Sequence, residues 1–152
     1  MSEVERPRIL PPFWLLGGLG MQWALRTYLP IADFEIPAAE TVSRGIGGFA
    51  LLLFAASAIQ FHLHRTTIEP GAVSDALIVR GPYRWSRNPI YLAMALILFA
   101  AAIRLSCASA FLPMLGFVWV ITTRFIAMEE RMLVDRFGAQ YVDYCLSVRR
   151  WL

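Results

Sequence analysis

Lysine is absent from this 152-residue chain, and all fourteen basic residues are arginine. Charged residues are also scarce, at 16% of the chain, whereas a soluble domain usually has about a quarter. The formal net charge of +3 is dispersed along the chain, which excludes the clustered basic surface of a nucleic-acid-binding protein. Because 58% of the residues are hydrophobic, the composition also excludes a disordered chain and disfavours a soluble single domain.

Few residues are available for metal binding or disulfide formation. Cys107 lies in an apolar stretch and Cys145 in the polar tail, so we expect two free thiols. His62 and His64 diverge on a helix and have no further cysteine or histidine to complete a metal shell, so we expect no metal site. The first ten residues mix acids with bases and no small-residue cleavage site follows, so we expect the first apolar block to be retained.

Long apolar blocks are abundant, and they predict an all-α integral membrane protein with about four transmembrane helices. The first two blocks are residues 13–29 and 45–61, within an N-terminal part formed by residues 1–65. The third and fourth share residues 90–123, which we divide into a hairpin at Arg104. Each half reaches about 24 Å, less than the roughly 30 Å of a hydrocarbon core, so we extend the fourth span through Met128. We expect residues 1–152 to form a single membrane domain.

The arginine positions predict the orientation of these spans. With the N-terminus in the cytosol, three arginines lie on the far side: Arg26, Arg44 and Arg104. The other eleven lie on the cytosolic side: Arg6, Arg8, Arg65, Arg80, Arg84, Arg87, Arg124, Arg131, Arg136, Arg149 and Arg150. The positive-inside rule therefore favours a cytosolic position for both termini. We expect the protein to cross the inner membrane of the cell several times. Residues 62–89 and 129–152 would then share the cytosolic face.

Glycines recur in the first two blocks, at positions 17, 18, 20, 45, 47 and 48. A phosphate-binding glycine loop would need a preceding strand, and the sequence offers none. We therefore expect these glycines to permit close packing between helices.

The first cytosolic segment carries the run LIVRGPYRWSRNPIY, which leads into the third span. Gly81 begins a turn, and Asn88 followed by Pro89 predicts a helix start with asparagine as the N-cap. The helix N-terminus, Arg84 and Arg87 would together suit an anionic group such as a carboxylate. The alternative is that these arginines anchor the chain beside lipid headgroups, in a belt with nearby aromatic residues.

The second cytosolic segment continues the helical pattern of the fourth span. Leu133, Phe137 and Tyr141 recur at four-residue spacing, and Gly138 predicts a break. We expect this segment to lie along the membrane surface as an interfacial helix. Glu129 and Glu130 fall where the chain leaves the membrane, and as a simple alternative they form exposed pairs with Arg124 or Arg131.

Three elements in this half carry a resemblance: LIVRGPYRWSRNPIY, then EERML, then FGAQYVDYCLSVRRWL. Together they make residues 66–152 similar to the integral-membrane methyltransferases that include isoprenylcysteine carboxyl methyltransferase and the phospholipid N-methyltransferases. The resemblance implies an enzyme dependent on S-adenosyl-L-methionine. It also implies a cofactor pocket open to the cytosol, without a parallel sheet, and a lipophilic small-molecule acceptor that enters from the membrane lipid.

The resemblance also implies site residues. The family's R-H-P-x-Y motif falls on Arg87, Asn88, Pro89, Ile90 and Tyr91, its E-E pair falls on Glu129 and Glu130, and the stretch covering the adenosine corresponds to Val79, Gly81 and Tyr83. We expect all of these except Ile90 to bind the cofactor, and Arg87, Asn88, Tyr91 and Glu130 to act in catalysis. Asn88 replaces the histidine of the eukaryotic carboxyl methyltransferases, as in similar bacterial R-N-P variants, and asparagine cannot act as a base.

The sequence leaves the acceptor and the oligomeric state open. A carboxylate acceptor, as in an isoprenylcysteine-like compound, is already ionised and needs no general base. An amine or thiol must lose a proton, and Glu130 or Tyr91 would then be the candidate base. In either case Glu129 and Glu130 would hold the cofactor's ribose hydroxyls or ammonium, and Arg87 a carboxylate. An NADPH-dependent reductase similar to the sterol reductases and a non-catalytic membrane subunit are the alternatives.

Overall fold

A computed structural model describes residues 10–63 and 77–152, which form helices joined by short loops. The elements, in chain order, are α1 (Pro11–Tyr28), α2 (Ala39–Leu63), η1 (Gly81–Arg84), α3 (Pro89–Leu105), η2 (Ala108–Ala110), α4 (Phe111–Val120), η3 (Ile121–Ile126), α5 (Ala127–Phe137) and α6 (Ala139–Ser147). The predicted all-α fold is confirmed for these residues. Arg6, Arg8, His64, Arg65 and the predicted boundary at residue 65 lie outside the described ranges.

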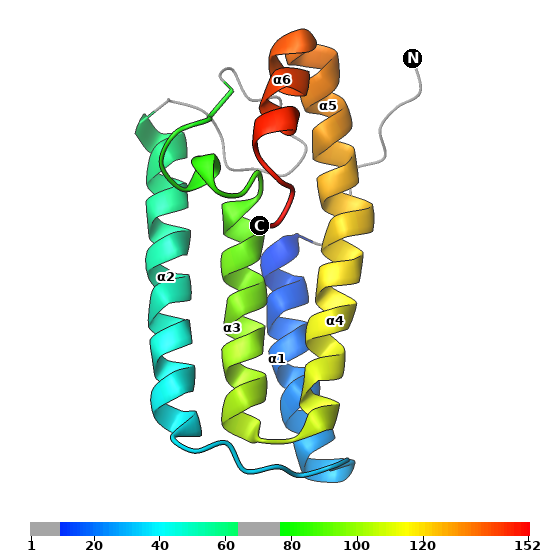
Figure 1. Cartoon of the computed structure of the whole chain (residues 1–152). Coiled ribbons are helices and arrows are strands. Elements are labelled where there is room, and N and C mark those ends of the chain that lie inside the picture. The colour runs from blue at the N-terminus through cyan, green and yellow to red at the C-terminus, as the bar shows by residue number, and fades with distance from the viewer. Residues whose placement is uncertain (1–9, 64–76) are drawn as a thin grey trace.

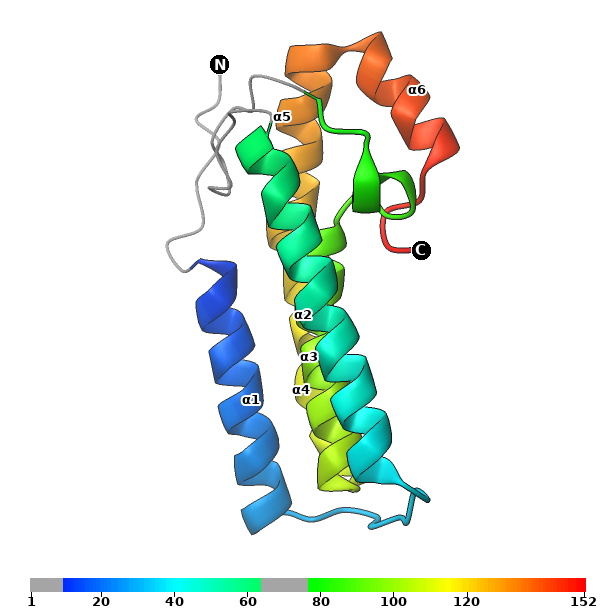
Figure 2. The same ribbon diagram turned by 90° about the vertical axis from the view of Figure 1, so that its left-hand side faces the viewer.

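The long helices form a bundle in which α3 is central (Figure 1). Helix α2 packs against α3, whereas α1 packs against both α3 and α4, so α1 and α2 cover different sides of the bundle (Figure 2). The buried core lies where α3 meets the helix that runs from α4 through η3. It consists of Tyr91, Met94, Leu98, Phe117, Ile121, Phe125 and Ile126.

Two of the described helices are long and apolar enough to cross a membrane, namely Ala39–Phe61 and Ala108–Phe137. In the most apolar stretch of each helix, only 22% and 28% of the residues, respectively, are buried within the bundle. A core helix of a soluble protein would be mostly buried. Large side chains such as Leu52 and Trp119 are instead exposed. These two helices indicate association with a membrane, while the four spans and their orientation stay predictions.

The predicted hairpin at Arg104 is confirmed. Helix α3 ends at Leu105, and Ser106 adopts a left-handed conformation that turns the chain into η2 and α4. Helix α2 begins earlier than its apolar block, at Ala39. Its first turns carry Glu40, whose Oε1 lies 2.6 Å from Arg44 Nη2 and 3.1 Å from Arg104 Nη1. The apolar pattern of the sequence does not identify these first turns of α2, because they carry charged side chains.

Helix α1 is fixed to the bundle by a buried polar side chain. Gln22 is 1% exposed, and its Nε2 donates hydrogen bonds of 2.9 Å to the carbonyls of Leu98 and Ala110. Gly18 allows this approach, since a Cβ at that position would lie 3.0 Å from Leu98 Cδ2. The other glycines of these blocks make few contacts within the described chain: a Cβ at Gly47 would only just touch Ala100, and the remaining four face open space, so close packing at these four stays a prediction.

The chain reverses after α5. Gly138, with φ +52°, ends α5 and lets α6 turn away from the bundle axis, as the predicted break requires. Helix α5 itself continues the direction of α4 (Figure 1), so the prediction of a surface helix starting at Glu129 is wrong for this part. The interfacial position of α6 stays a prediction. Cys107 and Cys145 are both free thiols, as expected.

Candidate active site

The loop before α3 is held against α2. Gly81 has φ +60°, and a Cβ there would lie 2.9 Å from Gln60 Nε2, so both backbone shape and close approach favour glycine. The following residues Pro82 and Tyr83 are buried, and the Tyr83 ring meets Phe61 edge-on with centroids 5.9 Å apart. The predicted turn at Gly81 is confirmed, and it turns Tyr83 toward the interior of the bundle.

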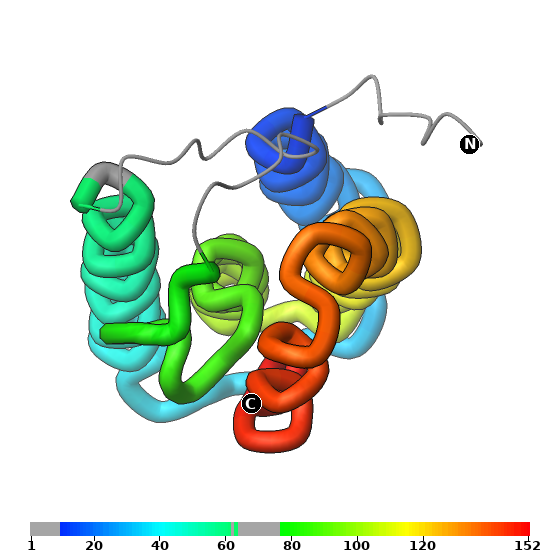
Figure 3. Tube along the Cα trace, turned by 90° about the horizontal axis from the view of Figure 1, so that it is seen from above, coloured from blue at the N-terminus to red at the C-terminus, as the bar shows by residue number. Residues whose placement is uncertain are grey.

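Asn88 precedes α3 and Pro89 occupies its first turn, as predicted. The Asn88 side chain makes no capping hydrogen bond, however, and its Nδ2 instead donates to the Arg150 carbonyl at 2.9 Å. The Arg87 N–H donates to the Arg149 carbonyl, also at 2.9 Å. The chain after α6 therefore pairs with the loop before α3, and Figure 3 shows the two segments at the same end of the bundle.

Glu130 forms ion pairs with two arginines. Arg87 Nη1 lies 3.2 Å from Glu130 Oε1, and Arg150 binds both carboxylate oxygens, with Nη2 at 2.6 Å and Nε at 3.0 Å. The side chains of Arg87 and Glu130 are 14% and 17% exposed, so this pair is largely removed from water. The alternative pairing of Glu130 with Arg131 is wrong, since the exposed Arg131 bonds a carbonyl of its own helix.

Glu129 faces a different partner from Glu130. The Tyr91 hydroxyl donates to Glu129 Oε1 at 2.5 Å, which joins the first turn of α3 to the first turn of α5. The two glutamates thus connect the R-N-P-x-Y run with the helix that follows α4. The sequence separation of 38 residues between Tyr91 and Glu129 is spanned by the α3–α4 hairpin.

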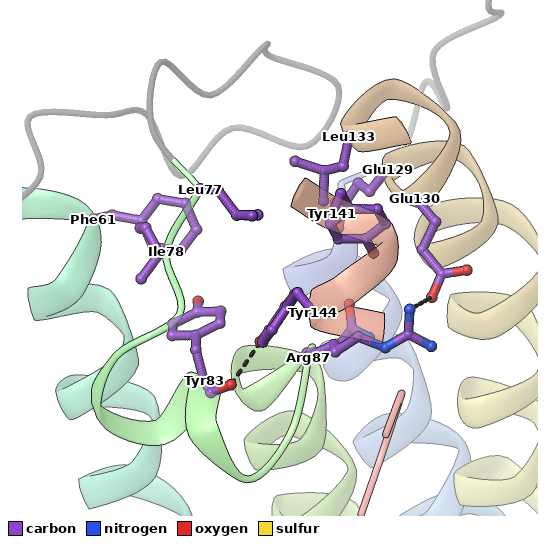
Figure 4. A pocket seen from close by; sticks show the side chains of 11 residues that line it. Phe61, Leu77, Ile78, Tyr83, Arg87, Glu129, Glu130, Leu133, Tyr141 and Tyr144 are labelled. Atoms are coloured by element: carbon purple, nitrogen blue, oxygen red, sulfur yellow. Dashed lines mark hydrogen bonds and ion pairs between the residues drawn. The ribbon is translucent and has the colours of Figure 1, made fainter. Parts of the chain in front are cut away.

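Two adjoining cavities meet at these residues. The first occupies about 540 Å³ including the open space at its mouth and is shown in Figure 4; it is lined by Phe61, Leu77, Ile78, Tyr83, Arg87, Asn88, Glu129, Glu130, Leu133, Tyr141 and Tyr144. The second, measured in the same way, occupies about 620 Å³ and is lined by Pro11, Pro12, Phe54, Phe61, Tyr83, Arg87, Asn88, Ile90, Tyr91, Met94 and Glu129.

Most predicted site residues line these cavities. Tyr83, Arg87, Asn88 and Glu129 line both, Glu130 lines the first and Tyr91 the second. Pro89 is buried and lines neither.

Val79 and Gly81, whose stretch of backbone is expected to cover the adenosine, are exposed and lie outside the cavity wall, which Leu77 and Ile78 line instead. Their part in cofactor binding stays a prediction. In extended chain successive side chains point in opposite directions, so a buried Ile78 leaves Val79 facing out. Arg84 is likewise exposed and lies outside both cavity walls, so it does not join Arg87 in an anion site as predicted.

Tyrosines from α6 complete the first cavity, and sequence reasoning missed them. The Tyr144 hydroxyl donates to the Tyr83 carbonyl at 2.6 Å (Figure 4). Burial raises the pKa of Tyr144 to about 12, and burial also raises the pKa of the Tyr83 and Tyr141 phenols. These hydroxyls stay protonated near neutral pH, so they can donate hydrogen bonds but do not serve as bases. Of these, the sequence pattern included only Tyr141, four residues after Phe137, and only as part of an apolar helix face.

A π-helical turn lies just before the glutamates. Helix η3 has the wider i→i+5 hydrogen bonding, and such turns often occur at functional sites. Thr122 and Thr123 return hydroxyl hydrogen bonds to the carbonyls of Val118 and Trp119, at 2.6 and 2.8 Å. The extra residue of this turn changes the direction in which Glu129 and Glu130 project from the helix.

Comparison with known proteins identifies the family of this chain. The sequence model of the phospholipid methyltransferase family matches residues 43–140, which include the first two of the three elements and the beginning of the third. The chain belongs to this family, so the predicted resemblance is confirmed, and the family implies a methyltransferase of the membrane type. An uncharacterized protein of Haemophilus influenzae is 41% identical over 63 residues, which cover 41% of this chain and 100% of that relative.

Proposed function

We propose that this protein transfers a methyl group from S-adenosyl-L-methionine to a lipophilic acceptor, at the cytosolic face of an inner membrane that it crosses several times. The observation that supports this is the pair of adjoining cavities with five wall residues in common, Phe61, Tyr83, Arg87, Asn88 and Glu129. Both cavities have mainly apolar walls, and the first adds two tyrosines of α6 and the Arg87–Glu130 ion pair. A ligand in each cavity can therefore meet the other at the shared wall.

The first cavity suits the cofactor by the chemistry of its wall. Tyr83, Tyr141 and Phe61 offer aromatic faces for a purine and a sulfonium, and Glu129 offers a carboxylate for a cation. Arg87 Nε is buried and has no hydrogen-bond partner within the described chain, so it is available to a carboxylate. When bound, the cofactor supplies a methyl group on a sulfonium for in-line displacement.

The second cavity suits the acceptor. Pro11 and Pro12 at the start of α1, Phe54 of α2 and Met94 of α3 give it an apolar wall. Helices α1 and α2 expose apolar side chains to the surroundings, so a membrane-soluble molecule can approach this wall from the bilayer. The cavity therefore favours an acceptor with a hydrophobic body.

Charges at the shared wall bear on the reacting group of the acceptor. Arg87 is already paired with Glu130, and Glu129 presents a carboxylate beside the apolar cavity. A carboxylate acceptor would meet Glu129 as a like charge, whereas an amine would meet an opposite charge. We therefore favour an amine acceptor, such as a phospholipid headgroup, over the carboxylate of an isoprenylcysteine-like compound. The proton that the amine must release before it accepts the methyl group would pass to Glu129, the carboxylate at the shared wall.

The protein's own contribution would be positioning and exclusion of water. Tyr91 holds Glu129 by its hydroxyl, and Asn88 is held by the Arg150 carbonyl, so both face the junction in fixed orientations. Holding two reactants in line can supply effective molarities of roughly 10⁵–10⁸ M. Both Glu130 oxygens accept hydrogen bonds from Arg150, so Glu130 is better suited to binding than to proton abstraction.

Calorimetry of the detergent-purified protein tests the cofactor. S-adenosylmethionine and its demethylated product should bind with micromolar affinity, NADPH should not bind, and Glu130→Gln should abolish binding. Glu40→Gln is a matched control, because Glu40 also pairs with two arginines but lies at the opposite end of the bundle. Binding of NADPH alone would support a reductase, and a folded protein that binds neither would support a non-catalytic subunit.

Transfer of a labelled methyl group tests the acceptor. Vesicles containing phosphatidylethanolamine are compared with a farnesylated cysteine analogue at the same concentration. We expect label in the phospholipid, and label in the cysteine analogue alone would reject the amine assignment while leaving methyl transfer intact.

A further inference from the structure

The last residues of the chain connect the two halves of the candidate site. The Arg150 guanidinium binds both oxygens of Glu130, while its backbone carbonyl accepts from Asn88 Nδ2 at 2.9 Å and from Ser86 Oγ at 3.3 Å. Asn88 belongs to the loop before α3, and Glu130 belongs to α5. No other residue among those described is recorded with hydrogen bonds to both.

We infer that Arg150 is a positioning residue, which sets the orientation of Asn88 and Glu130 toward the cofactor cavity without lining that cavity itself. The inference deepens the proposed function and rests on it for the identity of the ligand. Both of its targets line the first cavity, whereas Arg150 is absent from either wall. Its side chain is 41% exposed, so its outer part faces solvent rather than the site.

The guanidinium and the backbone carbonyl of Arg150 act together, because the position of one limits the position of the other. The guanidinium and the carboxylate form a bidentate, charge-assisted pair, which fixes both distance and direction. This pair holds the backbone after α6 in place, and the Arg149 and Arg150 carbonyls can then accept from the Arg87 N–H and from Asn88. Trp151, which packs against the core cluster, also helps to hold this segment. Loss of the guanidinium should therefore loosen the loop before α3 as well as Glu130.

A hydrogen-exchange experiment on the ligand-free protein tests this directly. Arg150→Gln should speed exchange of the Arg87 amide by about tenfold or more, since its acceptor carbonyl loses the anchor. Arg150→Lys keeps the charge but not the bidentate geometry, and it should fall between wild type and Arg150→Gln. Arg131→Gln is the control: it removes an exposed arginine next to Glu130 and should leave exchange unchanged.

Calorimetry with S-adenosylmethionine supplies the second readout on the same four proteins. We expect Arg150→Gln to weaken binding by about tenfold or more. Arg150→Lys should bind with an affinity between those of wild type and Arg150→Gln, and Arg131→Gln should bind as wild type does. Unchanged affinity in Arg150→Gln would overturn the inference. Weaker affinity without faster exchange of the Arg87 amide would also overturn it, because Arg150 would then act by contacting the ligand.

The two proposals fail in different ways. If wild-type protein binds no S-adenosylmethionine, the proposed function fails, yet hydrogen exchange still decides whether Arg150 orders the loop. If the wild type binds and all four proteins exchange alike, the positioning role fails alone. Circular dichroism of each variant confirms that the helices are retained, and Arg150→Lys keeps the test decisive if Arg150→Gln does not fold.

Discussion

The Tyr91 hydroxyl and the Glu129 carboxylate meet at 2.5 Å, and this contact ties the beginning of α3 to the beginning of α5. Tyr91 is buried, Glu129 is partly buried, and both lie within the stretch that the family model matches. The contact places a carboxylate at the wall that the two cavities share. A single phenol therefore orders the group that lies between the two proposed ligands.

Replacement of Tyr91 by phenylalanine removes this hydrogen bond and keeps the ring. A buried carboxylate that loses a donor costs about 1–3 kcal/mol, so we expect affinity for S-adenosylmethionine to fall roughly tenfold or more. Calorimetry measures the effect. Tyr28→Phe, in an exposed tyrosine at the far end of α1, is the control. Equal affinity in Tyr91→Phe and wild type would show that Glu129 is positioned by other contacts.

The ion pair between Arg87 and Glu130 should show strong coupling in a double-mutant cycle. Arg87→Gln and Glu130→Gln each leave a largely buried charge with fewer partners, while the double variant removes both charges. Neighbours of this kind typically couple by about 0.5–3 kcal/mol. Thermal unfolding in detergent measures stability of the four proteins. Additive losses would contradict the close pairing seen in the structure.

Gln22 should contribute to stability and not to the site. Gln22→Ala removes two buried hydrogen bonds to carbonyls and leaves a space between α1 and α3, so a loss of about 2–4 kcal/mol is expected. Thermal unfolding should report this loss, whereas affinity for S-adenosylmethionine should stay within twofold of wild type. A large loss of affinity would mean that α1 also shapes the cofactor cavity.

The π-helical turn should set the direction of the glutamates. Deletion of Thr123 removes one residue from η3, and each residue of a helix turns it by about 100°, so Glu129 and Glu130 would swing away from Tyr91 and Arg87. We expect unchanged helical content by circular dichroism and loss of cofactor binding by calorimetry. Thr123→Ala keeps the length and should bind as wild type does. Retained binding after the deletion would show that cofactor binding does not depend on the helical register that η3 sets.

The sequence was sufficient for the helices and for the two motif segments. The Arg104 break, the Pro89 helix start and the Gly138 turn all lie where composition and turn chemistry put them. These features are local, because each depends on a few adjacent residues. The arginine distribution placed the segments of Arg87 and Glu130 on one side of the membrane, and in the structure these two residues form an ion pair at one end of the bundle.

The remaining features depend on contacts between distant segments. The sequence did not show that the side chain of Ile78 lines the cavity while that of Val79 is exposed, because the direction of an extended residue depends on which neighbour the bundle buries. Arg150 was placed only as one cytosolic arginine among eleven, since nothing in its local sequence indicates a partner 20 residues away. The π-helical turn was also missed, because its residues read as an ordinary apolar helix.

The carbonyl oxygens of Arg149 and Arg150 have a consequence for mutational surveys. Each accepts a hydrogen bond from the loop before α3, and every amino acid would supply the same oxygen. Alanine scanning therefore leaves these acceptors in place and will underestimate how much the segment after α6 contributes. An amide-to-ester replacement at Arg87, introduced by semisynthesis, would remove the donor and reveal the contribution of the backbone alone.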